Sequence, residues 1–215
     1  CDRRQRQMCI RDRNKSVRIA ENLEKFLLGI GLEQNDIDHA KNTILVSPHP
    51  DDYYITSSGC TTKITVIPVS KIIGTNRSTS GNSIYENIRC IPDTGLDYSK
   101  FQRCFNEFSN YNSLKEWQSS FCTEIEPIRA DYYPDTDEYF ICGDGNHRTL
   151  TAMLIGAPYI KAKVCVRECN YYIKERYDIE QSFKKKYHIS KMQGYLLPCP
   201  CKIIIHFQNP PVIIH

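Results

Sequence analysis

The chain contains 215 residues, 40% of them hydrophobic, and its formal net charge is +3 at pH 7. This length supports one main core with additions, and the small charge is far from the strongly basic balance of proteins that bind mainly through a phosphate backbone. No apolar run approaches the roughly 18 residues of a membrane-spanning helix, and residues 1–13 lack the apolar stretch of a signal peptide. We expect a soluble, cytoplasmic protein without a membrane partner, for which nucleic acid is not an implied ligand.

The N-terminal region, residues 1–60, is predicted to be helical. Ser16 can cap an amphipathic helix that Gly29 and Gly31 bring to an end. The apolar stripe of this helix comprises Val17, Ala20, Leu23, Leu27 and Ile30. A second short helix is expected to follow Asn35.

Residues 61–169 are predicted to form the core. The β-branched run 63–73 predicts one strand, and the small polar residues 74–83 predict a loop. Aromatic and aliphatic residues then recur twice at helical spacing, which predicts two helices that pack into the core rather than against a cofactor. These stripes comprise Phe101, Phe105 and Phe108, then Leu114, Trp117 and Phe121. Ser113 and Glu116 form a capping-box pattern at the start of the second helix.

The second half of the core alternates strands with a helix. Residues 124–133 and 138–145 predict two strands joined by a turn at 134–137. A helix that begins at Asn146 is expected to end at Gly156. The remaining elements are a strand at 160–169, a charged helix at 170–188, and Pro-containing turns with Ile-rich extended pieces up to residue 215. Residues 170–215 are therefore predicted to form a C-terminal helix and a Pro-rich β extension.

Eleven cysteines are present, an odd number at irregular spacings, in a chain too long to need covalent staples. Most are expected to be reduced thiols. One arrangement could hold a metal, because four thiolates can close a zinc site. These four are Cys165, Cys169, Cys199 and Cys201. Their spacing is loose, so zinc at this group stays an open alternative to ordinary thiols, and no metal ligand is assigned.

Glycines and polar side chains gather at residues 142–154, CGDGNHRTLTAML, where a strand is expected to turn into a helix. The first N–H groups of a helix are unpaired and favour an anion. Gly143 and Gly145 permit close approach to the backbone. His147 and Arg148 fall in the first turn, where a cation conflicts with the helix dipole unless an anion is bound. The junction therefore predicts an anion site.

The side chains at this junction suit a phosphate. Arg148 can bind it through two parallel hydrogen bonds, and His147 can donate from a ring nitrogen to a further oxygen. Asp144 can cap the helix, or it can hold a divalent cation that accompanies a polyphosphate. In the alternative interpretation Asp144 caps, Arg148 pairs with a carboxylate such as Glu168, and His147 is a surface residue.

Residues 124–164 resemble the ParB/sulfiredoxin-like superfamily, whose members share a strand, a G-x-x-R or G-x-H-R turn, a helix, and then an LG…I.A.V pattern. The matching residues are Gly145-Asn146-His147-Arg148, Leu154-Ile155-Gly156 and Ile160-Lys161-Ala162-Lys163-Val164. Residues 64–77 look like the superfamily's first strand and its arginine loop, with Arg77 at the matching place. The resemblance covers roughly residues 63–169 and implies a ParB/sulfiredoxin-like mixed-sheet core. The predicted fold is therefore α+β, with this core preceded by the helical N-terminal region and followed by the small C-terminal helix and β extension.

In that superfamily the turn holds the phosphates of a nucleotide: ATP in sulfiredoxins, CTP with Mg²⁺ in ParB partition proteins and ADP in free-serine kinases. The resemblance implies that Gly145, His147 and Arg148 bind phosphate. Asn146 departs from the pattern. Sulfiredoxins have their catalytic cysteine at this place, so sulfinic-acid reduction is not expected, and ParB proteins have a glutamate that helps to hold the metal, for which asparagine is a poorer ligand. A ParB partition protein also needs a DNA-reading helical domain downstream, and residues 170–215 offer one clear helix.

A second loop is expected to complete the phosphate site, because one turn alone gives little selectivity. A cation and several hydroxyl donors come from Arg77, Ser78, Thr79, Ser80 and Ser83. Glu86, just beyond, is a candidate general base for a hydroxyl that attacks a phosphoryl group. The alternatives are a flexible surface loop and a solvated glutamate.

A competing motif lies in residues 43–52, TILVSPHPDD, which resemble the start of the zinc-dependent LmbE-like deacetylases. The zinc ligands and base would correspond to His49, Asp51 and Asp52. However, Tyr53 follows the aspartates, and no helix long enough for a parallel βαβ unit separates them from the run that begins at residue 63. The deacetylase is therefore the weaker hypothesis.

We expect a nucleotide-binding enzyme that transfers or hydrolyses a phosphoryl group. Its cofactor is ATP, ADP or CTP, and Mg²⁺ is an open addition. The catalytic candidates are His147 and Glu86, and the binding candidates are Asp144, Gly145, Asn146, His147, Arg148, Arg77 and Ser78. Two alternatives remain: a nucleotide-controlled module that binds DNA or a protein partner, and a DNA nuclease or DNA-associated accessory protein.

Overall fold

The structure is a computed structural model that describes residues 22–56, 62–89, 96–123, 126–187, 203–205 and 212–214. It divides into two compact units, each described here by itself. The larger unit takes in residues 22–50 and 54–169, and the smaller takes in residues 51–53 with the chain from residue 170 onward. None of the helices in these described ranges is long and apolar enough to cross a membrane.

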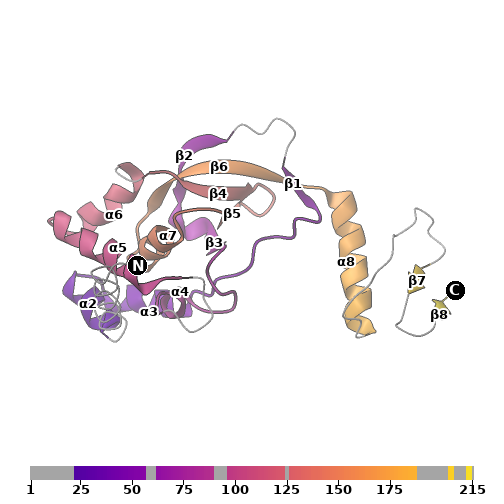
Figure 1. Ribbon diagram of the computed structural model, residues 1–215, viewed down its shortest axis with the longest axis horizontal. Helices are drawn as coiled ribbons and strands as arrows, with labels where there is room; N and C mark the ends of the chain where they lie inside the picture. Colours follow the sequence, from indigo (N-terminus) through magenta and orange to yellow (C-terminus); the bar gives the residue numbers. More distant parts are fainter. Residues whose placement is uncertain are drawn as a thin grey trace, which may run out of the picture. The chain divides into compact units, whose positions relative to one another are not determined.

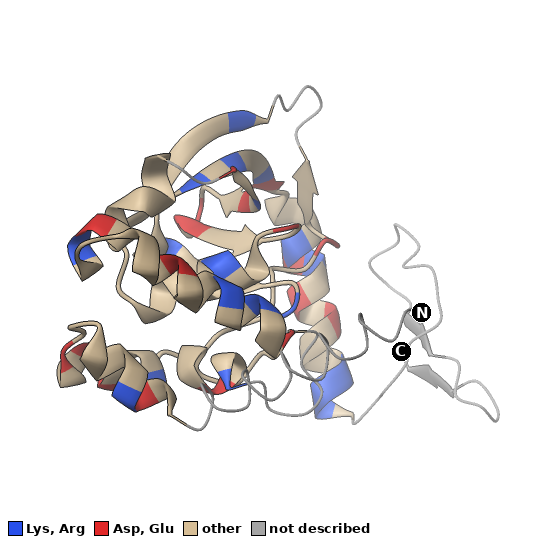
Figure 2. Ribbon diagram, turned by 60° about the vertical axis from the view of Figure 1, so that its left-hand side comes forward, with Lys and Arg blue, Asp and Glu red and all other residues tan. Residues whose placement is uncertain are grey.

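The larger unit combines a mixed sheet with helices (Figure 1, and turned by 60° in Figure 2). Its strands are β1 Tyr54–Thr56, β2 Lys63–Pro68, β3 Ile72–Thr75, β4 Ile128–Tyr133, β5 Glu138–Ile141 and β6 Tyr159–Cys169. They lie in the order β1-β6-β4-β5-β3, and β2 also pairs with β6. The β4–β6 and β3–β5 pairs are parallel, and the others are antiparallel. The expected α+β class with a mixed sheet is therefore confirmed.

The helices of this unit are α2 Leu23–Gly29, α3 Gln34–Asn42, α4 Ile84–Ile88, α5 Tyr98–Asn106, α6 Leu114–Thr123 and α7 Asn146–Leu154. Two 3-10 turns, η1 Val69–Lys71 and η2 Glu107–Asn110, complete them. The predicted first helix is confirmed from Leu23 onward; Ser16, Val17 and Ala20 lie outside the described residues. Ser113 Oγ accepts a hydrogen bond from the Glu116 N–H at 3.2 Å, so α6 begins where the capping pattern predicted.

The predicted single strand at 63–73 is wrong, because the chain breaks into β2, η1 and β3. Pro68 stands at the break, and its missing N–H and fixed φ are compatible with a strand end rather than with a continuous ladder. Before the break β2 pairs antiparallel with β6, and after it β3 pairs parallel with β5. The 3-10 turn thus leads the chain from β2, which pairs with β6, to β3, which pairs with β5. The loop after β3 therefore lies next to the end of β5, where the Asn76 N–H donates to the Ile141 carbonyl.

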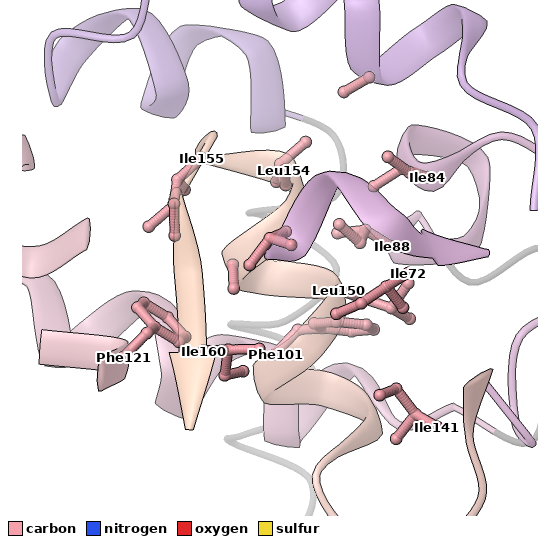
Figure 3. Packing of buried hydrophobic residues seen from close by; sticks show 14 of the residues in the cluster. Ile72, Ile84, Ile88, Phe101, Phe121, Ile141, Leu150, Leu154, Ile155 and Ile160 are labelled. Carbon is pink, nitrogen blue, oxygen red and sulfur yellow. The ribbon is translucent and has the colours of Figure 1, made fainter. Parts of the chain in front are cut away.

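Helix α7 lies at the centre of the packing and contacts α3, α4, α5 and η1. Figure 3 shows its Leu150 and Leu154 among side chains from the sheet and from other helices. Both predicted aromatic stripes supply this core, since Phe101, Phe105, Trp117 and Phe121 are buried. Burial of such a side chain contributes about 1.5–3 kcal/mol, so the position of α7 is held by apolar contacts on several sides.

The smaller unit contains α8, Tyr171–Lys186, which begins one residue after the predicted start. Asn170 caps it by accepting a hydrogen bond from the Ile173 N–H at 3.2 Å. The ring of Tyr53 packs edge-on against Tyr177, with centroids 5.2 Å apart. No residue of α8 is fully buried, which agrees with the charged helix predicted here. Two short strands, β7 Ile203–Ile205 and β8 Val212–Ile214, form an antiparallel pair.

Candidate functional site

The candidate site lies where β5 ends and α7 begins. Gly145 occupies the N-cap position of α7 with a φ of 101°, a left-handed conformation that favours glycine. No side chain in the described part of the chain caps the helix, so the interpretation of Asp144 as the cap is wrong. The loop is instead held by Asn146 Nδ2, which donates to the Gly143 carbonyl at 2.8 Å. Glycine at the N-cap leaves the helix end open.

The first backbone amides of α7 are unpaired within the described part of the chain. The first helical bond runs from the Thr149 N–H to the Gly145 carbonyl at 2.8 Å, and the N–H groups of Asn146, His147 and Arg148 donate to no described residue. Unpaired amides at a helix N-terminus carry a partial positive charge and bind anions. This is the arrangement that the sequence predicted at the junction.

A cleft with a volume of about 310 Å³ opens beside these amides. Its lining residues are Arg77, Lys100, Arg103, Cys104, Glu107, Asp144, Gly145, Asn146, His147 and Arg148. Four permanent cations thus face two carboxylates. Figure 2 shows Lys and Arg segments grouped near the middle of the larger unit. The electrostatic balance of the cleft favours a ligand with more than one negative charge.

The structure brings together most, but not all, of the predicted site residues. Arg77 from the loop after β3 shares the cleft with the turn at 144–148. Ser78 is not among the lining residues; its Oγ donates to the Thr75 carbonyl at 2.9 Å and accepts from the Thr75 N–H at 3.0 Å. Ser78 therefore shapes the turn that carries Arg77 rather than facing the cleft.

Glu86 also lies outside the cleft lining. Its carboxylate accepts a hydrogen bond from the Ser83 N–H at 2.7 Å, and Ser83 Oγ accepts from the Glu86 N–H at 3.1 Å. The pair is a capping box at the start of α4. Glu86 and Ser83 thus have a structural role in the described contacts, and Glu86 is removed from the catalytic set.

Helix α5 and η2 add lining residues that the sequence did not predict. Lys100, Arg103 and Glu107 follow one another at intervals of three and four, so they share one side of the α5–η2 segment. The opposite side carries the buried Phe101 and Phe105. Periodicity could have identified this polar face, but it could not have shown that α7 and Arg77 lie across from it.

His147 is buried, with 8% of its surface exposed. Its Nε2 accepts a hydrogen bond from the Asp97 N–H at 2.9 Å, and its ring packs edge-on against Phe101 with centroids 4.8 Å apart. Burial, with the nearby Lys100 charge, lowers the pKa of His147 to about 4. The ring is therefore neutral at pH 7, and acceptance at Nε2 assigns its proton to Nδ1. The expected conflict between a cationic His147 and the helix dipole does not arise.

The lowered pKa of His147 predicts a loss of stability in acid. Below pH 6.5 the unfolded state binds a proton at His147, whereas the folded state does not do so until about pH 4. The free energy of unfolding should therefore fall by about 2 kcal/mol across this window because of this residue alone. Urea denaturation of the wild type and of His147→Gln at several pH values isolates this contribution, and parallel pH profiles of the two proteins would contradict it.

Arg148 is half-buried in the first turn of α7. Its Nη1 donates to the Glu126 backbone carbonyl at 2.9 Å, and among the described residues no carboxylate lies within ion-pair distance of it. The alternative pairing with Glu168 is therefore not formed. One hydrogen bond to a carbonyl fixes the direction of the guanidinium and leaves its charge unneutralised, which suits a phosphate ligand.

The competing motif at 43–52 takes a different role. His49 Nε2 lies 2.9 Å from Glu138 Oε2, and its ring packs against Tyr54 and Tyr133 with centroids 5.0 and 4.5 Å apart. No group of three His, Cys, Asp or Glu side chains that could hold a metal occurs within the described ranges. These contacts connect His49 to the first residue of β5 and give the deacetylase hypothesis no support.

The zinc alternative involves residues in two different situations. Cys165 and Cys169 are half-buried on β6 and form no disulfide with a described residue. Cys199 and Cys201 lie outside the described residues. Zinc binding by this group of four remains a prediction.

No protein-family model matches the chain, and no curated protein or solved structure matches it. The resemblance to the ParB/sulfiredoxin-like superfamily therefore stays an expectation from the sequence.

Proposed function

We propose that the cleft binds the phosphate groups of a nucleotide and that the protein is a nucleotide-dependent enzyme of the ParB/sulfiredoxin-like type, which transfers or hydrolyses a phosphoryl group. The observation that supports this most strongly is that four cations line one cleft together with three helix amides that donate to no described residue. Structural ion pairs would neutralise such cations, whereas a polyphosphate requires them to stay available. The G-x-H-R turn at residues 145–148 supports the same ligand class through its resemblance to that superfamily.

The lining residues divide the binding task. The amides of residues 146–148 and the Arg148 guanidinium together can surround one phosphate with fixed donors. Arg77 from the loop after β3, and Lys100 and Arg103 from α5, face the same space and suit a second phosphate. A volume of about 310 Å³ is at the small end of ligand pockets. The cleft therefore fits the polyphosphate part of ATP, ADP or CTP better than it fits a whole nucleotide.

Mg²⁺ commonly accompanies nucleotide phosphates, and two oxygen ligands in the cleft suit it. The Asp144 carboxylate is exposed there. Asn146 Oδ1 is buried and has no hydrogen-bond partner among the described residues, so it is an acceptor that a cation or a ligand donor would satisfy. Since Mg²⁺ prefers six oxygen ligands, phosphate oxygens and water would have to supply the rest. The cation would neutralise charge on the phosphates.

Arg148→Ala tests the phosphate site. ATP, ADP and CTP with Mg²⁺ should raise the melting temperature of the wild type, whereas the variant should lose most of this shift, because its affinity falls by at least about tenfold when a bidentate charged contact is removed. Arg148→Lys keeps the charge without the planar fork and should recover only part of the shift. Arg176→Ala on α8 removes the same kind of side chain from a position outside the cleft lining and serves as the matched control.

The unliganded melting temperature of Arg148→Ala should stay close to that of the wild type, because the half-buried side chain gives up one hydrogen bond, worth about 1 kcal/mol. An unchanged nucleotide shift in Arg148→Ala, or no shift in the wild type, would remove the assignment. Release of phosphate or transfer to an acceptor identifies an enzyme, whereas stabilisation without product identifies a nucleotide-controlled binding module. Nicking of plasmid DNA that is indifferent to nucleotide would identify a nuclease instead.

A further inference from the structure

The cleft contains a carboxylate whose position differs from those of the phosphate-binding groups. Glu107 begins η2, directly after α5, and lines the cleft together with Arg103 and Arg148. Its backbone N–H donates to the carbonyls of Arg103 and Phe105, but its carboxylate forms no ion pair with another described residue, and the residue is exposed. A carboxylate that lies among cations without forming an ion pair can still accept a hydrogen bond from a water molecule or a hydroxyl group of a ligand.

The other two acidic candidates are less suited to this role. Glu86 accepts from the Ser83 N–H at 2.7 Å in a capping box and does not line the cleft. Asp144 lines the cleft, but it stands on the loop before the helix amides, where its charge suits a cation beside the phosphates. Glu107 comes from α5–η2, a different wall from the turn at 144–148. From this wall, the Glu107 carboxylate can contact the attacking water or alcohol while the turn at 144–148 binds the phosphate.

We propose that Glu107 is the general base of the cleft and accepts the proton of the water or alcohol that attacks the terminal phosphate held by Arg148. This assignment rests on the proposed phosphoryl-transfer function. It names a catalytic residue on η2, which lies between the two segments, 64–77 and 124–164, whose residues carry the sequence resemblance.

The step balances as follows for water. The Glu107 carboxylate takes one proton from the attacking water, and the water oxygen forms a bond to the terminal phosphorus. The bond between this phosphorus and the bridging oxygen breaks, and its electron pair stays on the bridging oxygen of the shortened nucleotide. The cations of Arg148, Arg103 and Lys100 lie in the cleft where negative charge gathers on the phosphate oxygens. An alcohol in place of water gives a phosphorylated product by the same proton transfer.

The surroundings of Glu107 support this chemistry. Partial burial raises the pKa of Glu107, while Arg148 and Arg103 act in the opposite direction. A base is stronger as its pKa rises, provided that it stays ionised at the working pH. The other titratable groups that line the cleft are His147, Asp144, Cys104 and Lys100. Of these, His147 has a pKa lowered to about 4, and Asp144 carries the other carboxylate of the cleft, so variants have to separate both from Glu107.

The experiment compares Glu107→Gln, Asp144→Asn and Glu86→Gln in the full chain, with ATP, ADP and CTP as probes in the presence of Mg²⁺. Glu107→Gln should keep the nucleotide-induced rise in melting temperature and lose about 100-fold in the rate of phosphate release or transfer. The fall in rate towards acid pH should also disappear in this variant, because an amide does not titrate. Glu86→Gln can still accept a hydrogen bond from the Ser83 N–H, and it should keep both the wild-type rate and the fall in rate towards acid pH.

The outcomes separate this inference from the function on which it rests. If no probe stabilises the wild type, the proposed function fails, and the role of Glu107 fails with it. If nucleotides stabilise the wild type but nothing turns over, or if Glu107→Gln keeps its rate, the nucleotide site stands and the assignment of Glu107 is overturned. Loss of the acid limb in Asp144→Asn, with Glu107→Gln unaffected, would assign the base to Asp144 instead.

Discussion

Gly145→Ala is expected to lower the free energy of unfolding by about 3 kcal/mol, because alanine at this position suffers both backbone strain and a steric clash. The φ of 101° lies in the left-handed region, which costs a side chain about 1 kcal/mol or more. An added Cβ would also lie only 2.3 Å from Cγ2 and 2.9 Å from Cβ of Ile128. Ile128 is fully buried in β4, so it cannot move aside without disturbing the sheet.

Gly81→Ala provides the matched control for this prediction. Gly81 has a similar φ of 90°, but no atom lies within 4 Å of an added Cβ. It should therefore lose only the backbone contribution of about 1 kcal/mol. Urea denaturation measures both variants. Gly145→Ala should in addition show a smaller nucleotide shift, because the N-terminus of α7 must move. Equal losses in the two variants would mean that Ile128 does not restrict the junction.

The sequence predicted those parts of the fold that depend on local pattern. The hairpin of β4 and β5, helix α7 with its end near Gly156, and strand β6 were all expected close to where they lie, because turn residues and apolar periodicity are local signals. The strand expected at 63–73 failed at Pro68, which also was a local signal. The prediction followed the strand propensity of the β-branched residues around Pro68, although a proline in such a run argues against a continuous strand.

The site was predicted in part for the same reason. The open end of α7 follows from Gly145 and the helix behind it, and these are adjacent in sequence. Glu86 was predicted to be a general base, although Ser83 and Glu86 have the spacing of a capping box and form one in the structure. The prediction took the small polar residues 74–83 as a ligand-binding loop and therefore missed this structural role. Lys100, Arg103 and Glu107 could not have been placed, since helical periodicity identifies a polar face but not the element across from it.

Asn87→Ala is expected to lower the free energy of unfolding by about 3 kcal/mol and to weaken the contribution of Arg77 to ligand binding. Asn87 is fully buried. Its Oδ1 accepts from the Thr79 N–H at 2.7 Å, and its Nδ2 donates to the Ser83 carbonyl at 2.9 Å. Alanine would leave both backbone groups without this partner inside the protein, where an unpaired polar group is costly. Because these bonds hold the loop that follows Arg77, its guanidinium would lose its fixed place in the cleft.

Asn42→Ala is the matched control, because Asn42 also donates from Nδ2 to a backbone carbonyl, that of Asp38 at 2.8 Å, but in an exposed position. Water can replace that bond, so its loss should cost less than about 0.5 kcal/mol. Urea denaturation compares the two stabilities, and amide hydrogen exchange at Thr79 and Gly81 should become faster only in Asn87→Ala. The nucleotide-induced rise in melting temperature should shrink in Asn87→Ala and stay unchanged in Asn42→Ala. If exchange became faster while that rise stayed at the wild-type value, the loop would be held by Asn87 as described, but Arg77 would contribute nothing to the phosphate site.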